Sequence, residues 1–209
     1  PAGAATLATV TTIALSPQSL PIVLMTSTVV LAATAVTGDP REQVLARVAT
    51  AGFTILYLGV PIGALVAVQV QFGPQVLMVL LGSVIASDTA QYYGGRTFGR
   101  HLLAPTISPK KTIEGAVCGL VASGVALFFA GGVVMPSVDS GSHVLLGLLI
   151  ALLGIAGDLF ESRLKRASDM KDSSTLIPGH GGVLDRIDGL LLAAPVYYVV
   201  VTALTKGSL

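Results

Sequence analysis

Long apolar runs constrain the fold of this chain more than any other feature. Six runs approach the ~20 residues that a helix needs to cross a ~30 Å hydrocarbon core, and a shorter run lies near the start. None alternates with period two, so helices are favoured over a β-barrel. The prediction is an all-α, polytopic integral-membrane bundle of about six to seven transmembrane helices. The runs cover roughly residues 2–15, 19–36, 51–71, 75–93, 113–134, 144–160 and 188–205.

The composition supports a lipid-solvated chain. Hydrophobic residues make up 53% of the 209, charged residues only 11%, and the mean hydropathy is +0.83. A soluble domain carries about 25% charged residues. The single cysteine, Cys118, excludes an intrachain disulfide and a cysteine-based metal cluster, and it is expected to be a buried packing residue. The absence of an initiator methionine suggests that residues upstream of Pro1 are missing.

Basic residues give the bundle an orientation. Eleven of the twelve lysines and arginines fall in the loops at roughly 37–50, 94–112 and 161–187, and only Lys206 lies on the other side. The positive-inside rule puts these loops in the cytoplasm, so a cytoplasmic site is expected. We divide the chain into N-terminal transmembrane helices, 1–73, and a catalytic transmembrane region with active-site loops, 74–209.

Two aspartates interrupt the apolar runs. A carboxylate at the centre of a membrane helix costs about 2.5–3.5 kcal/mol, and such residues usually face a polar cavity. Asp88 is equally consistent with a solvated carboxylate at headgroup level. Asp158 favours function, because Ser162, Lys165 and Arg166 follow it on the same helical stripe.

The next loop combines glycines with paired acids. Residues 178–182 form a Pro-Gly-His-Gly-Gly turn whose backbone amides can approach an anion. Asp185 and Asp188, three residues apart, share a helix face, and two such carboxylates suit Mg²⁺. Acids that merely complement a helix dipole are the alternative. His180 is either a phosphate ligand or proton carrier, or a structural turn residue.

The loop at roughly 94–112 has a less specific pattern of candidate site residues. Ser108 followed by Pro109 predicts a helix N-cap with proline at the first helical position. Lys110 and Lys111 bind phosphate near that helix start, or they only satisfy the charge bias. His143 is expected on the non-cytoplasmic surface.

Residues 162–188 resemble the signature of the phosphatidate cytidylyltransferase (CDP-diacylglycerol synthase) family. Every fixed position of the pattern matches: Ser162, Leu164, Lys165, Arg166, Lys171, Asp172, Ser174, and the Pro-x-His-Gly-Gly…Asp-Arg-x-Asp run from 178 to 188. Residues 108–115 and 157–161 also look like the family. The resemblance implies a Mg²⁺-dependent transferase of phospholipid biosynthesis that converts CTP and phosphatidic acid into CDP-diacylglycerol and pyrophosphate.

The resemblance and the residue chemistry together give expected roles. The metal ligands are Asp158, Asp185 and Asp188, and the resemblance suggests that a second ion is monovalent, such as K⁺. The catalytic residues are Asp158, Lys165, Asp185, Arg186 and Asp188. The substrate-binding residues are Ser162, Arg166, Lys171, His180, Gly181, Gly182, Lys110, Lys111 and Arg96. The expected partners are CTP, phosphatidic acid, the lipid bilayer and a second copy in a homodimer, with no nucleic acid, and the expected location is the bacterial inner membrane.

Three alternative functions match the sequence less well. A CDP-alcohol phosphatidyltransferase needs two further aspartates after Asp188, and none follows. Polyprenol or phytol kinases and archaeal-type cytidylyltransferases share the plan but differ in lipid. A transporter would use Asp88 and Asp158 as an ion path, but it would distribute acids across the membrane depth, whereas here they gather at one face.

Overall fold

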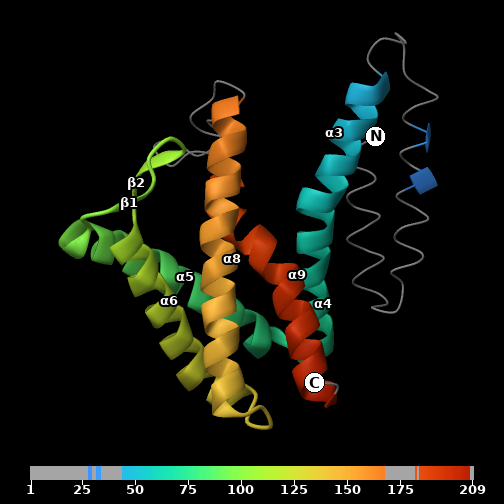
Figure 1. Ribbon diagram of the computed structural model, residues 1–209. Helices are drawn as coiled ribbons and strands as arrows, with labels where there is room; N and C mark the ends of the chain where they lie inside the picture. The colour runs from blue at the N-terminus through green and yellow to red at the C-terminus, as the bar shows by residue number, and fades with distance from the viewer. Residues whose placement is uncertain (1–27, 30–31, 34–43, 168–181, 183, 208–209) are drawn as a thin grey trace. The chain divides into compact units, whose positions relative to one another are not determined.

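The computed structural model describes residues 28–29, 32–33, 44–167, 182 and 184–207, and the chain divides into two compact units, Pro1–Pro74 and Gln75–Leu209 (Figure 1). In the described part, five helices are long and apolar enough to cross a membrane. They are Val44–Phe72, Pro74–Phe98, Ile113–Val134, Ser140–Ala167 and Leu184–Lys206. The chain is therefore an integral membrane protein, as predicted. The expected runs 2–15 and 19–36 lie almost wholly outside the described residues.

Within the first unit, residues 44–72 form a continuous helix of three segments. These are α3 (Val44–Thr54), a π-helical stretch (Ile55–Gly59) and α4 (Val60–Phe72). Pro61 has no N–H to donate to the carbonyl one turn earlier, which accounts for the interruption of regular α-helix here. Residues 44–50 are helical and so do not belong to the expected loop 37–50, whose remaining residues lie outside the described part. Gly73, with φ of 89°, ends α4 in a conformation that favours glycine.

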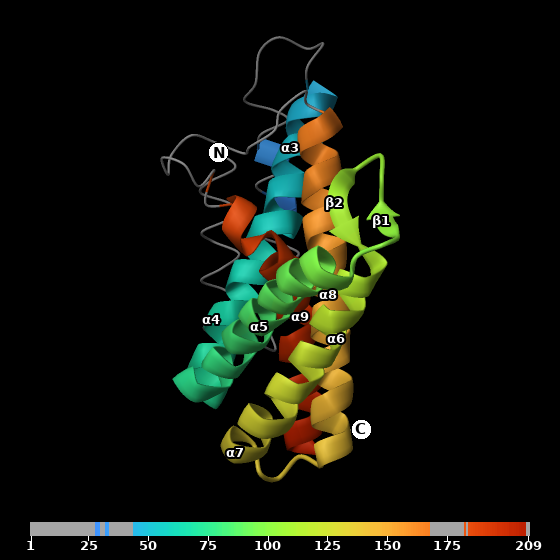
Figure 2. The same cartoon turned by 90° about the vertical axis from the view of Figure 1, so that its left-hand side faces the viewer.

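The second unit is built on α8 (Ser140–Ala167). This helix packs against α9 (Leu184–Lys206) and against α6 (Ile113–Ala126), which continues through a π-helical stretch, Leu127–Gly131, into α7 (Gly132–Val134). Figure 2 shows α6 and α8 side by side. The Tyr197 hydroxyl of α9 donates to the Val76 carbonyl of α5 (Pro74–Phe98) at 2.9 Å, which links these two helices.

A β-hairpin joins α5 to α6, which the all-α prediction missed. Strands β1 (Leu102–Ala104) and β2 (Ser108–Thr112) pair antiparallel. Ser108 is therefore not a helix cap. Thr112 caps α6, because its side-chain oxygen accepts the Gly115 N–H at 3.1 Å. Pro109 lies in a strand with only one hydrogen-bonded neighbour in the described sheet, where proline is tolerated.

The opposite end of α8 corrects the expectation for His143. His143 is only 1% exposed, because its ring packs beside Gly131, so it is buried and not on the surface.

Asp139 caps α8: its carboxylate accepts the backbone N–H and the hydroxyl of Ser142. These hydrogen bonds from Ser142 hold the pKa of Asp139 below its ordinary value.

Candidate functional site

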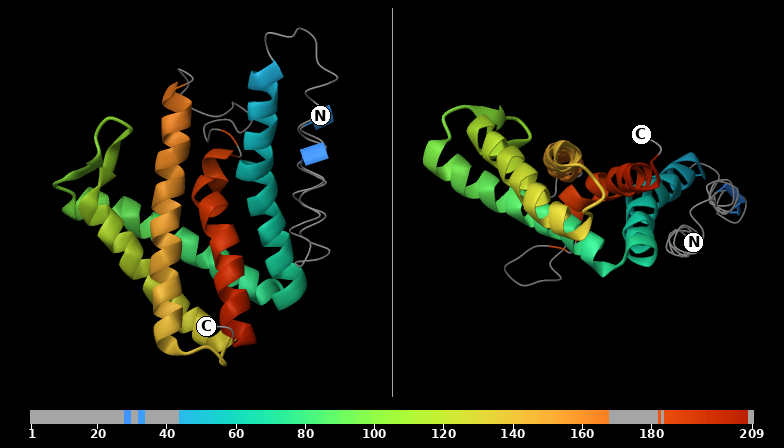
Figure 3. Two further views of the ribbon diagram at one scale, coloured as in Figure 1. Left: turned by 45° about the vertical axis from the view of Figure 1, so that its right-hand side comes forward. Right: turned by 90° about the horizontal axis from the view of Figure 1, so that it is seen from below.

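Glycines bring α8 and α9 close together where the two helices cross. A Cβ on Gly157 would come within 2.5 Å of the Asp188 carbonyl oxygen and 3.2 Å of the Gly189 Cα. A Cβ on Gly189 would in turn lie 3.2 Å from the Gly154 carbonyl oxygen. Small residues permit this approach of two backbones in a membrane bundle. Figure 3 shows the two helices side by side. The crossing brings the acids of α8 next to those of α9.

A lysine links the two helices just beyond this crossing. Lys165 of α8 donates from Nζ to Asp185 Oδ1 of α9 at 2.5 Å, and the same ammonium lies 2.8 Å from Glu161 Oε2. The Lys165 side chain is 17% exposed and that of Glu161 is 1% exposed. The second oxygen of Asp185 accepts the Gly182 N–H at 2.7 Å. A half-buried cation therefore lies between carboxylates from both helices, where such contacts are stronger than in water.

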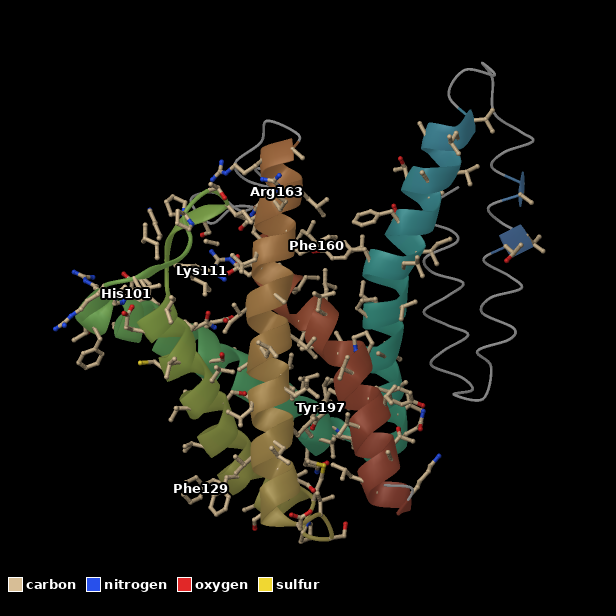
Figure 4. All side chains as sticks on the ribbon, in the orientation of Figure 1. His101, Lys111, Phe129, Phe160, Arg163 and Tyr197 are labelled. Carbon is tan, nitrogen blue, oxygen red and sulfur yellow. The ribbon has the colours of Figure 1, made fainter. Side chains whose placement is uncertain are left out.

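A second lysine connects the hairpin to α8. The Lys111 ammonium of β2 forms an ion pair with Asp158, and the Ser162 hydroxyl donates to the other Asp158 oxygen at 3.3 Å. In Figure 4, Lys111 lies between the hairpin and α8, whereas His101 lies at the outer side of the hairpin, away from α8. The loop lysine and the helical stripe expected from the sequence thus meet at Asp158.

Two further acids border this network. Asp88 of α5 lies near Lys111 and Asp158, and its carboxylate accepts from the Gln91 amide at 3.2 Å. Asp188 of α9 lies close to Asp158 and Glu161 and accepts the Gly189 N–H at 2.7 Å. We call Asp88, Asp158, Glu161, Asp185 and Asp188, with Lys111 and Lys165, the joint cluster.

Several predicted site residues lie outside the joint cluster. Arg96 lies in the last turn of α5, where it contacts the Tyr92 hydroxyl at 3.5 Å. Arg166, Arg186 and Lys110 are exposed. Lys171, His180 and Gly181 fall outside the described residues, and of that loop only the Gly182 N–H can be placed, on Asp185.

The sequence does not predict the part that two glutamates play in the structure. Glu161 was noted only as part of a family-like segment, yet it is the most buried carboxylate of the joint cluster. Glu114 organises the hairpin, because one oxygen accepts the backbone N–H groups of Arg100 and His101 and the other lies 2.6 Å from His101 Nδ1. The sequence signals were weak: Glu161 follows an apolar run, Glu114 lies at the start of one, and both fall in segments that look like the family, 157–161 and 108–115.

The donor chemistry of the joint cluster suits a hard cation. Carboxylate oxygens from α8 and α9 face one another, and such oxygens are the ligands that Mg²⁺ takes alongside substrate phosphates. Among the described residues, however, no three acids, histidines or cysteines are grouped closely enough to hold an ion. Lysines contact Asp158 and Asp185. The described carboxylates therefore match Mg²⁺ in the type of ligand they offer and in their proximity to one another, while lysines occupy two of them.

Comparison with known proteins identifies the family. The sequence profile of the cytidylyltransferase family matches residues 2–204, nearly the whole chain. This chain belongs to the cytidylyltransferase family. Cytidylyltransferases use CTP, so a cluster of cations beside metal-type acids at one end of the bundle accords with the phosphates that the family handles.

Individual relatives cover different shares of the chain. The phosphatidate cytidylyltransferase of Helicobacter pylori is 44% identical over 141 residues, which is 66% of this chain and 52% of the relative. That of Thermotoga maritima is 33% identical over 170 residues, 79% of this chain and 63% of the relative. The phosphatidate cytidylyltransferase of Mycobacterium bovis is 44% identical over 126 residues, which is 58% of this chain and 40% of the relative. The matched region thus spans about half the length of these curated relatives.

Proposed function

We propose that this chain transfers a cytidylyl group from CTP to phosphatidic acid, giving CDP-diacylglycerol and pyrophosphate for phospholipid biosynthesis. The observation that carries the proposal is the joint cluster: lysines and carboxylates from α5, β2, α8 and α9 meet where two membrane helices cross. Family membership supports the cytidylyl donor, and the names of the relatives support the lipid acceptor. A water-soluble nucleotide and a membrane-held lipid can meet at such a site.

The reaction needs no nucleophile from the protein. A phosphate oxygen of the lipid attacks the α-phosphorus of CTP, and the bond from that phosphorus to the β-phosphate bridging oxygen breaks. The electron pair leaves with pyrophosphate. Such a transfer depends mainly on positioning and on stabilising negative charge in a preorganised site.

Lysines of the joint cluster supply part of that stabilisation. Lys165 and Lys111 are held in place by carboxylates, so their charges are fixed before substrate binds. We assign the triphosphate to Lys165, Arg166, Lys171 and Arg186, with the glycine turn at 179–182 and His180 contributing to phosphate binding. Lys110, Lys111 and Arg96 are assigned to the lipid headgroup or to pyrophosphate, and Ser162 supports Asp158.

We assign Mg²⁺ to Asp158, Asp185 and Asp188, with a second, monovalent ion such as K⁺ nearby. When bound, the divalent ion would neutralise charge on the attacking and leaving oxygens. The protein's part is to present these carboxylates together. The close approach of Gly157 to Asp188 favours that arrangement.

The setting of the site is also part of the proposal. The excess of basic residues at the hairpin end, where α5 and α8 end and α6 and α9 begin, favours a cytoplasmic active site in a bacterial inner membrane. We propose six to seven spans in all, catalysis within 74–209, and a homodimer supported by the glycine-rich helix faces.

Turnover by the purified protein tests this function. The protein is reconstituted in detergent–lipid micelles with radiolabelled CTP and phosphatidic acid, a polyprenol or phytol, with and without Mg²⁺. We expect CDP-diacylglycerol and an equal amount of pyrophosphate only with phosphatidic acid and Mg²⁺. Product with an alcohol acceptor alone would reassign the lipid, and no product under any condition would refute the proposal.

A further inference from the structure

Glu161 is the one carboxylate of the joint cluster that is withdrawn from solvent. The Glu161 side chain is 1% exposed, whereas the side chains of Asp158 and Asp185 are 38% and 13% exposed. A buried carboxylate in a membrane bundle is costly unless a cation compensates it. Lys165, at 2.8 Å, is the cation that lies against it.

The contacts of Lys165 show what Glu161 does for it. The Nζ atom lies 2.5 Å from Asp185 Oδ1 and 2.8 Å from Glu161 Oε2, and an ammonium has three N–H groups, so Lys165 contacts both carboxylates at once. Glu161 lies one helical turn before Lys165, so the two are neighbours on the face of α8 that meets α9. The glutamate therefore compensates the charge of the lysine and fixes its direction while the lysine donates to Asp185.

We propose that Glu161 is the positioning residue for Lys165, holding its ammonium at the α8–α9 crossing toward Asp185 so that it meets the nucleotide phosphates. This inference rests on the proposed function for its kinetic consequence. It names a role within the site for a residue that reaches no substrate itself, because its carboxylate is enclosed between the helices.

The kinetic test uses substitutions that change charge and reach separately. Glu161→Gln keeps the shape but removes the charge, and we expect kcat to fall about 10- to 100-fold, the range that losing a charge-assisted contact predicts. Glu161→Asp keeps the charge at shorter reach and should recover at least part of that loss. In a Lys165→Met background, Glu161→Gln should cause little further loss, because the glutamate acts through the lysine.

Ser123→Ala is the matched structural control. Ser123 is buried in α6, and its hydroxyl donates to the Gly147 carbonyl of α8 at 2.8 Å, remote from the joint cluster. The variant should lower the thermal midpoint while leaving kcat and KM unchanged, and its effects should multiply with those of Glu161→Gln. A wild-type kcat in Glu161→Gln would overturn the inference. It would also be overturned if the double variant lost the product of the kcat losses of Glu161→Gln and Lys165→Met.

A second readout does not depend on turnover. Acetylation of Lys165 by acetic anhydride, followed by peptide mass spectrometry, measures how firmly its ammonium is held, with exposed Lys206 as the internal reference. We expect faster modification of Lys165 in Glu161→Gln than in wild type. An unchanged rate refutes the inference. Faster modification in a protein whose wild type makes no CDP-lipid would refute the proposed function alone.

Discussion

Gly157 of α8 lies directly against the backbone of Asp188 in α9, with no room for a side chain between them. A Cβ on Gly157 would come 2.5 Å from the Asp188 carbonyl oxygen, a contact that only a shift of backbone could relieve. The joint cluster depends on this contact, because the acids of α8 and α9 are drawn together around it.

Gly157→Val therefore should separate the two helices and disable the site. Overpacking a tight contact costs about 1–3 kcal/mol, and a displacement of about 1 Å can reduce turnover about 100-fold. The measurements are the thermal midpoint in detergent and the rate of CDP-lipid formation. Gly82→Val is the matched control, because nothing lies within 4 Å of a Cβ there and the residue is exposed on α5. A wild-type rate in Gly157→Val would contradict the assigned crossing.

Lys111 and Lys110 are adjacent on β2, yet their predicted effects differ. Lys111→Met removes the cation that contacts Asp158, so kcat should fall about 10- to 100-fold. Lys110 is exposed, and exposed charges contribute less than about 1 kcal/mol, so Lys110→Met should raise the KM for phosphatidic acid at most about fivefold. Steady-state kinetics with both substrates varied distinguishes the two. Equal losses of kcat in both variants would argue against a special role for Lys111.

The Asp139 cap provides a prediction about stability alone. Asp139→Ala removes the acceptor for two Ser142 hydrogen bonds at the start of α8, at the end remote from the joint cluster, so the thermal midpoint should fall with kcat unchanged. Because folding lowers the pKa of Asp139, its contribution is present above the unfolded carboxyl value of about 3.9 and is lost as pH falls through the folded value.

Thermal unfolding as a function of pH checks this sign. The difference in midpoint between wild type and Asp139→Ala should stay constant from about pH 8 to pH 5 and shrink only below about pH 4. A difference that grows on acidification, or a large loss of kcat, would contradict the assignment of Asp139 to helix capping.

The sequence brought together some residues of the joint cluster but did not predict how they are arranged. Apolar runs located the described spans because length and hydropathy are properties of the segment itself. Asp158, Lys165 and Asp185 followed from helical periodicity and a family signature. Glu161 did not, because its burial depends on which face of α8 meets α9, and the contact of Gly157 with α9 decides that.

The loop before α6 shows a second limit. Ser108 and Pro109 match a helix start as well as they match a strand, so local pattern alone could not choose between them. The antiparallel pairing with β1 decided for the strand, and the helix begins where Thr112 can cap it. Arg96 was grouped with the loop, but α5 continues to Phe98 and places it in the last helical turn.

Formation of CDP-diacylglycerol by Asp185→Asn, against wild type, tests the central claim most directly. Asp185 accepts hydrogen bonds from the Lys165 ammonium and the Gly182 N–H, and it is assigned to the metal. The neutral Asp185→Asn variant should therefore insert and purify normally, but its kcat at saturating Mg²⁺ should fall at least about 100-fold. Asp158→Asn should behave alike. Wild-type CDP-lipid formation in Asp185→Asn would contradict the claim that the α8–α9 joint carries out cytidylyl transfer.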